Sequence, residues 1–269
     1  VRRQRQMCIR DRYEVDRSLL RNWHSPKARA LKAAILRRLG RDAEALQLCR
    51  ESLELDRFNY GCRFVEYMIR PDAGNLDEIV ALMHGNAHNY DEAALDFCNA
   101  GLWQEAETVW QTAIDNGAVT AMTYYYLGRC RLQAGDEEGA RRAFRQGRGE
   151  CPDFVFPNRP EAILALNAAL AMNPEDAHAH HYLGNLYYDK RQYDLAQAHW
   201  EEAARLDPEF PTVWRNLALV YYNKRNDSVK ALEAMEKAFS LDPTDSRILM
   251  ELDQLYKKLQ RPHSERLAF

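Results

Sequence analysis

Four histidines lie close together in the second half of the chain, at His178, His180, His181 and His199. Imidazole nitrogens bind Zn²⁺, and a zinc site needs three or four convergent ligands. On a helix, positions 178 and 181 share a face, whereas position 180 points to another side. We therefore expect packed or solvated histidines here and no metal. Protonation of these rings below their ordinary pKa of about 6.5 is expected to weaken the fold in mild acid.

Catalytic motifs are absent from the sequence. It contains no G-x-S-x-G, P-loop, H-E-x-x-H or EF-hand pattern. The 40 Asp and Glu residues make chance carboxylate pairs inevitable on helical surfaces, so no pair identifies an acid–base site. We expect a protein that is not an enzyme, with no catalytic residue and no cofactor.

Prolines and small residues recur at a regular spacing. Pro174, Pro208 and Pro243 are 34 and 35 residues apart. A proline cannot donate the backbone hydrogen bond that would extend a helix, so each one predicts a helix end. Between them, small residues stand where two helices would approach closely, and large apolar residues stand three or four positions away. The residues that we expect in these structural positions are Leu183, Gly184, Tyr187, Ala196, Trp200, Ala203, Pro208, Trp214, Tyr221, Ala231 and Pro243.

Residues 177–210 carry L-G-x2-Y, then A-x3-W, then a closing proline. This order resembles the tetratricopeptide repeat (TPR), a helix–turn–helix of about 34 residues. The resemblance implies an all-α fold, an α-solenoid in which stacked helix–turn–helix repeats form a right-handed superhelix. Solenoids of this kind mostly bind other proteins, so the expected partner is a protein or a peptide.

The repeat pattern predicts four parts of the chain. Residues 1–12 fit no repeat position and resemble a non-native leader, and residues 13–152 predict divergent N-terminal repeats. Residues 153–160 hold two prolines among apolar residues and predict a non-helical segment, which we call the plug. Residues 161–269 predict C-terminal repeats with a truncated last unit, and one extra residue is expected in an inner turn around residues 226–228. The expected units begin near residues 26, 60, 87 and 121 in the N-terminal part and, most clearly, at 177 and 211 in the C-terminal part.

In a repeat of this type, helical spacing directs a fixed set of first-helix positions toward the concave groove. Those positions hold aromatic, Arg and Asn side chains, which peptide-binding surfaces tend to use. We interpret them as a groove that binds a peptide or a partner domain; the alternative is a set of solvated polar residues without a groove ligand. The expected partner-binding residues are Tyr125, Arg129, His178, His181, Asn185, Tyr188, Arg215, Tyr222 and Arg247.

Some repeat domains bind the C-terminal carboxylate of a peptide with Lys, Asn, Asn, Lys and Arg at set positions of three consecutive units. Asn185, Asn216 and Arg247 match three of these positions, but His181 replaces the first Lys and Glu251 replaces the final Arg. A carboxylate site needs paired cationic donors, and Glu251 would repel the ligand. We therefore do not expect such a clamp.

The runs YLGNLYYDKRQYDLA, PTVWRNLALVYYNKRND and MELDQLYKKLQR are more specific than the general repeat pattern. They resemble the C-terminal repeat region of bacterial proteins with an N-terminal mutarotase-like β-sandwich domain of unknown function. This resemblance implies a carbohydrate-related context and adds no catalytic residue. It also gives a second expected function, a structural or self-association appendage of a larger carbohydrate-active protein. In that case the partner is the chain's own N-terminal domain, and an exposed apolar patch lies within residues 13–60.

Composition limits the partner and the compartment. The net charge is −3, which gives no indication of a nucleic-acid or anionic-membrane partner. No apolar run approaches the ~18 residues that a membrane span needs. The six cysteines show no C-x-x-C pairing, and several fall on helical core positions, where cysteine acts as a small apolar residue. We expect a cytoplasmic protein.

Overall fold

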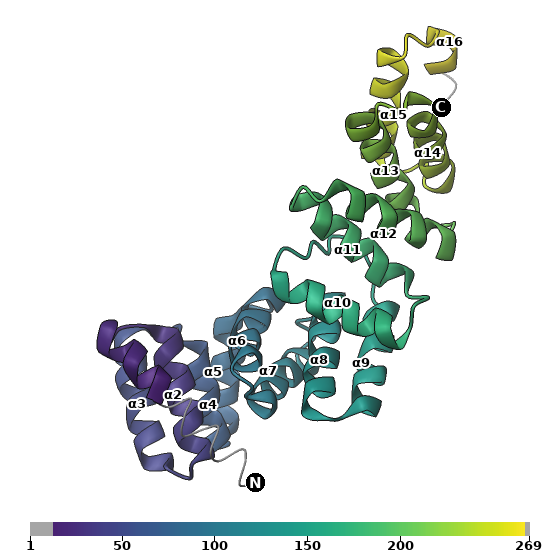
Figure 1. The fold of residues 1–269 in the computed structure, drawn as a ribbon. Coiled ribbons are helices and arrows are strands. Elements are labelled where there is room, and N and C mark those ends of the chain that lie inside the picture. Colours follow the sequence, from purple (N-terminus) through teal and green to yellow (C-terminus); the bar gives the residue numbers. More distant parts are fainter. Residues whose placement is uncertain (1–12, 267–269) are drawn as a thin grey trace. The chain divides into compact units, whose positions relative to one another are not determined.

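The computed structural model describes residues 13–266, which form helices and the turns between them, with no strand in this range (Figure 1). The predicted leader, residues 1–12, lies outside the described residues. Consecutive helices pack against each other in pairs, and the predicted all-α fold of stacked helix–turn–helix repeats is confirmed. The chain divides into two compact units, the first ending at Gly147 and the second beginning at Arg148.

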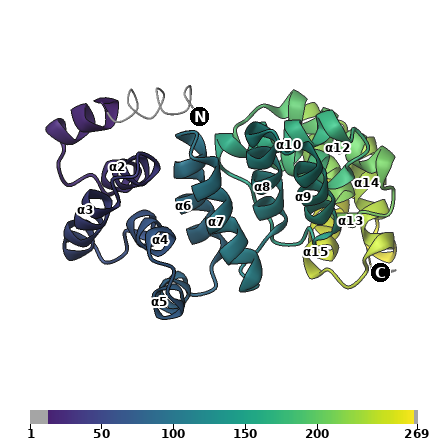
Figure 2. The ribbon, with the colours of Figure 1, turned by 90° about the horizontal axis from the view of Figure 1, so that it is seen from below.

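The first unit starts with a helix over residues 13–21 and continues as helix pairs. Helix α2 packs against α3, and α6 packs against α7 (Figure 2). Its labelled helices are α2 (Pro26–Arg38), α3 (Asp42–Leu55), α4 (Tyr60–Ile69), α5 (Ala73–Met83), α6 (Ala87–Asn99), α7 (Trp103–Asp115), α8 (Ala121–Ala134) and α9 (Glu137–Gly149), the last of which runs across the boundary.

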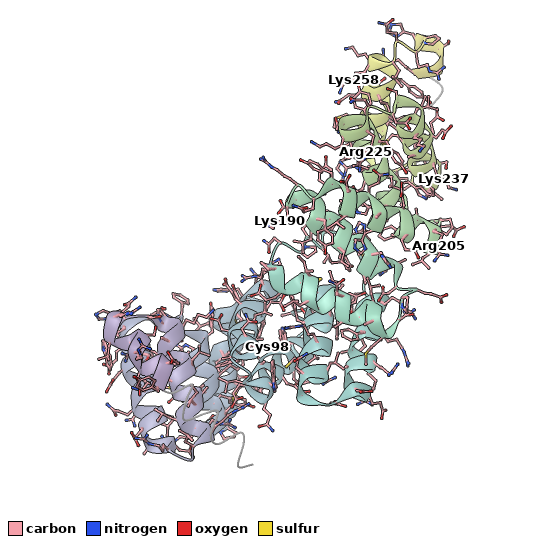
Figure 3. The ribbon with its side chains drawn as sticks, viewed as in Figure 1. Cys98, Lys190, Arg205, Arg225, Lys237 and Lys258 are labelled. Atoms are coloured by element: carbon pink, nitrogen blue, oxygen red, sulfur yellow. The ribbon has the colours of Figure 1, made fainter. Side chains whose placement is uncertain are left out.

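The second unit contains α10 (Pro160–Met172), α11 (Ala177–Asp189), α12 (Tyr193–Leu206), α13 (Pro211–Val220), the π-helix η1 (Tyr221–Arg225), α14 (Ser228–Leu241), α15 (Ser246–Lys258) and α16 (His263–Arg266). Helix α11 packs against α12, and α13 packs against α14. Figure 3 shows Lys190 and Lys258, at the ends of α11 and α15, on one side of this unit. Arg205 and Lys237 lie toward the C-terminal ends of α12 and α14, the second helices of their repeats. They are on the opposite side of the unit, because the second helix of a repeat runs antiparallel to the first.

The ends of these helices follow directly from the sequence. Pro174, Pro208 and Pro243 each come two residues after the last residue of α10, α12 and α14. Each next helix then begins with a polar cap or a proline in its first turn. The Asp176 side chain accepts a hydrogen bond from the backbone N–H of Ala179 at 3.0 Å, and caps α11.

Close helix–helix contact requires glycine at one position of the repeat. A Cβ atom added to Gly184 in α11 would lie far inside van der Waals contact of the Trp200 ring in α12. Gly128 stands in the same relation to Phe144 in the first unit, and both pairs are 16 residues apart. The same arrangement therefore recurs in both units and marks the repeat.

The extra residue of the unit beginning at Pro211 is absorbed in a π-helical turn. Tyr221–Arg225 form η1, and Asn226 follows in the left-handed conformation at φ 55°. The prediction placed the extra residue slightly later, around residues 226–228. A π-helical turn adds a residue while keeping the helix continuous, so the distortion lies within the first helix and not in the turn alone.

No helix forms between Gly149 and Pro160. In the plug, the side chains of Val155 and Pro157 are buried, whereas Phe154 is 85% exposed and Phe156 is 66% exposed. Phe154 also has a φ of 60°, in the left-handed region that a bulky side chain rarely adopts. The plug therefore turns the side chains of Val155 and Pro157 inward and two aromatic rings outward.

Candidate functional site

A cavity of about 800 Å³ lies within the second unit. One side is formed by α11, α13 and the beginning of α15, and another by Pro152 and the first residues of the plug. We refer to this cavity as the groove. The predicted partner-binding residues that line it are His181, Asn185, Tyr188, Arg215 and Arg247.

Asn185 lies at the centre of a hydrogen-bond network on the groove wall. Its side-chain oxygen accepts from Nε1 of Trp200 at 3.1 Å and from Nδ2 of Asn216 at 3.0 Å. Because the indole N–H is only a donor, these bonds fix the orientation of the Asn185 amide. Its Nδ2 then donates to Nε2 of His181 at 3.0 Å. The network links α11, α12 and α13 through one side chain.

His181 is almost fully buried, and its ring packs on Phe210 with 4.7 Å between ring centroids. Burial, and to a lesser extent the charge of His178, lowers the pKa of His181 to about 3. The ring is therefore neutral at physiological pH. Since Nε2 accepts from Asn185, the proton lies on Nδ1, which is buried without a hydrogen-bond partner among the described atoms.

Arg215 forms a two-point ion pair with Glu251. Its Nε donates to one carboxylate oxygen of Glu251 at 2.7 Å, and its Nη2 binds the other. Its Nη1 also donates to the side-chain oxygen of Asn216 at 3.3 Å. A two-point contact of this kind holds both side chains in one geometry. Sequence reasoning noted the acidic residue at 251 but did not predict this pairing between successive repeats.

The other histidines of α11 lie on different faces of the helix, as helical spacing predicts. His178 contacts Phe210, with ring centroids 5.4 Å apart, on the side of α11 that also carries His181. His180 points elsewhere, and its Nδ1 lies 2.9 Å from Nδ1 of His199 in α12. Burial and the nearby His180 lower the pKa of His199 to about 4. Within residues 13–266, no three His, Cys, Asp or Glu side chains come together as a metal-binding group.

Other predicted partner-binding residues lie outside the groove. Neither His178 nor Tyr222 lines it. The ring of Tyr222 instead lies under the ammonium group of Lys258, whose Nζ is 5.0 Å from the ring centroid. Tyr125 and Arg129 belong to α8 of the first unit. Tyr125 is fully buried and packs on Phe144, so the expectation that its side chain faces an open groove is corrected.

The plug supplies groove residues that sequence reasoning did not assign to the site. Asp153, Phe154, Val155 and Phe156 all line the cavity. The sequence did indicate that this segment departs from the repeat, since an apolar run between two prolines cannot continue it. It could not show where the segment lies, because a non-periodic stretch carries no information about the face that it contacts.

Comparisons with known proteins agree with this helix pattern. A model of the "TPR repeat" matches residues 184–224, and a model of the "Tetratricopeptide repeat" matches residues 92–153 and 158–190. These residues carry tetratricopeptide repeats. TPR segments in general mediate contacts between proteins, and both matched regions of the second unit include groove residues.

Solved TPR structures show low similarity to this chain. One is YrrB, "a TPR protein with an unusual peptide-binding site", with 16% identity, 88% of this chain and 96% of that chain covered, and a TM-score of 0.33. Yeast Tom70 has 14% identity, 93% and 51% coverage and a TM-score of 0.40. MamA has 17% identity, 79% and 95% coverage and a TM-score of 0.32. Because the identities and TM-scores are this low, we assign no residue of this chain a role from these structures.

None of the helices within residues 13–266 combines the length and the apolar character that crossing a bilayer requires. The TPR helices of this range instead present charged residues along their exposed faces.

Proposed function

We propose that the second unit is a non-catalytic scaffold that binds a peptide or an extended segment of a partner protein in the groove. The observation that carries this proposal is the network around Asn185, which fixes the polar groups of the groove wall before a ligand arrives. A site that is already ordered loses less conformational entropy on binding. His181 has a structural role in this proposal, because its ring is buried and bonded to Asn185.

Tyr188 and its neighbour Tyr187 allow a matched test. Both are half-buried tyrosines of α11, but Tyr188 lines the groove, whereas the Tyr187 ring stacks on His199 with 5.5 Å between centroids. Peptides selected from a random dodecapeptide display library on the full chain are measured by fluorescence anisotropy. We expect Tyr188→Ala to weaken binding about tenfold, as loss of an aromatic anchor does, and Tyr187→Ala to change it less than about twofold.

Circular dichroism checks that both variants are folded. The proposal is overturned if no peptide is enriched on the full chain, or if the two folded variants bind the selected peptides equally well.

We infer a second candidate function from the first helix and the turn that follows it. Tyr13, Leu20 and Trp23 are 62%, 87% and 50% exposed, within the range where an apolar docking patch was expected. Tyr13 and Leu20 are seven residues apart, so helical spacing places them on one face of this helix, and an exposed apolar face favours contact with another protein surface. Under this candidate, the array is a structural or self-association appendage of a larger carbohydrate-active protein. Sedimentation velocity over a concentration series tests self-association: a dimer lost in Leu20→Glu supports it, and a monomer at every concentration contradicts it.

A cytoplasmic location remains our inference. It is supported by Cys49, Cys62 and Cys130, which are buried as thiols in the first unit. Thiols persist in reducing compartments. Detection of the chain in a secreted fraction with these thiols oxidised would contradict this location.

A further inference from the structure

We propose that the groove selects a segment with a lysine or arginine beside an apolar side chain. This inference rests on the proposed function, because it names the class of segment that the same cavity takes. It is argued from the charges of the groove and from the exposed aromatic rings of the plug.

Both guanidinium groups that line the groove are already matched by carboxylates. Arg215 binds both oxygens of Glu251, with Nε of Arg215 2.7 Å from one of them. Arg247 pairs with Asp245 at 3.1 Å, and the hydrogen bond and charge of Asp245 raise the pKa of Arg247. The charges of Glu251 and Asp153 act on Arg247 in the same direction. Each of the two arginines is therefore offset by at least one carboxylate.

Two further carboxylates leave the groove with an excess of negative charge. Asp153 and Asp242 also line it, and neither forms an ion pair within residues 13–266. Asp242 accepts hydrogen bonds from the N–H and hydroxyl of Thr244, both of which are neutral donors, and these bonds lower the pKa of Asp242. Asp242 is thus ionised at neutral pH, and together with the carboxylate of Asp153 it favours a cationic ligand.

Two aromatic residues of the plug line the groove together with Asp153. Phe154 and Phe156 line the groove with 85% and 66% of their surfaces exposed, and the buried Val155 between them anchors the segment. The face of an aromatic ring attracts an ammonium or guanidinium group, and its apolar surface also packs against an aliphatic stem. A carboxylate next to two such rings fits the long side chain of lysine or arginine, which ends in a charge.

The amides of the groove are poorly placed to hold a carboxylate instead. Asn185 Nδ2 donates to His181, and Asn216 Nδ2 donates to the oxygen of Asn185. The groups that a carboxylate clamp would use are thus bonded within the network. An acidic segment or a peptide C-terminus would meet the unmatched carboxylates without a free cation.

The test compares peptide pools that differ in one charge. The probes are fluorescein-labelled octapeptides, amidated at the C-terminus and randomised over apolar residues, with a fixed central Lys, norleucine or Glu. A fourth pool has norleucine and a free C-terminal carboxylate. Anisotropy with the full chain should show the Lys pool binding about three- to tenfold more tightly than the norleucine pool, and the Glu pool binding most weakly.

Asp153→Asn should remove most of this preference for Lys, because Asp153 is exposed and forms no ion pair that the fold needs. Glu233→Gln is the matched control, since Glu233 is an exposed carboxylate of α14 outside the groove. The Glu233→Gln variant should prefer the Lys pool as strongly as the unmodified chain does.

The possible failures are distinguishable. Tightest binding by the Glu pool or the free-carboxylate pool overturns this inference and leaves groove binding standing. A Lys preference that Asp153→Asn leaves unchanged also overturns it. Absence of binding by all four pools contradicts the proposed function together with this inference.

Discussion

The side chain of Asn185 connects three helices of the second unit. It joins His181 of α11, Trp200 of α12 and Asn216 of α13 through hydrogen bonds of 3.0 to 3.1 Å. At the scale of single residues, the same amide therefore holds the repeat together and shapes the groove wall. Buried polar groups that lose their partners cost more than the bond contributes when it is formed.

Asn185→Ala is expected to lower the free energy of unfolding by about 2–3 kcal/mol, because it leaves the indole N–H of Trp200 and the amide of Asn216 without their acceptor. Urea unfolding followed by circular dichroism measures this change. Asn223→Ala serves as control, since Asn223 is exposed and should change stability by less than about 0.5 kcal/mol. Equal effects of the two substitutions would refute the role of the network.

The buried histidines predict a dependence of stability on pH. The pKa of His181 falls from 6.5 to about 3 in the folded chain, and that of His199 falls from 6.5 to about 4. The unfolded chain thus binds protons near pH 6.5 while the folded rings stay neutral. The free energy of unfolding should decrease as the pH falls below about 6.5, and His181 alone contributes up to about 1.4 kcal/mol per pH unit.

Urea unfolding at pH 7.5, 6.5 and 5.5 tests this expectation. The variant His24→Gln should keep the same pH dependence, because His24 is exposed in the first unit. The same free energy of unfolding at pH 7.5 and 5.5 would contradict the assigned burial of the histidine rings.

At the scale of helices, the contact between α11 and α12 depends on Gly184. Alanine normally favours a helix over glycine by about 1 kcal/mol. Gly184→Ala should nevertheless lower the free energy of unfolding by about 1–3 kcal/mol, because the added methyl group would overlap the Trp200 ring. Urea unfolding measures the effect, and the matched control is Gly149→Ala in α9, where an added Cβ meets nothing within 4 Å. If both substitutions raise the free energy of unfolding, α11 and α12 can move apart without a loss of stability, and the contact does not depend on Gly184.

The repeat positions show which features of the helices the sequence could predict. Proline positions and small residues act locally, so they predicted the ends of α10, α12 and α14 and the close approach at Gly184. The pairing of Arg215 with Glu251 was missed because it depends on how two successive repeats pack against each other. The burial of Tyr125 was missed because helical spacing gives a direction and does not show what covers the side chain.

The plug is a clearer case of a tertiary contact that the sequence could not predict. Its two prolines and apolar composition predicted a segment without a helix, but the contact between this segment and the groove involves residues far away in sequence. The sequence analysis consequently placed Asp153 and Phe154 in the plug and not among the partner-binding residues. Their position beside Arg247 and Tyr188 on the groove follows from the tertiary structure alone.

At the scale of the whole molecule, the chain consists of two compact units, and the proposed peptide site lies entirely in the second. Binding should therefore stabilise the second unit first, since a ligand stabilises the structure to which it binds. The first unit provides a reference within the same molecule, because none of its residues lines this groove.

Hydrogen exchange with and without a selected peptide tests the central claim most directly. We expect slower exchange in α11, α13 and residues 152–156, which line the groove, and unchanged exchange in α2 to α7 of the first unit. Protection confined to the first unit, or to α14 and α16 outside the groove, would contradict a peptide site between α11, α13, α15 and the plug.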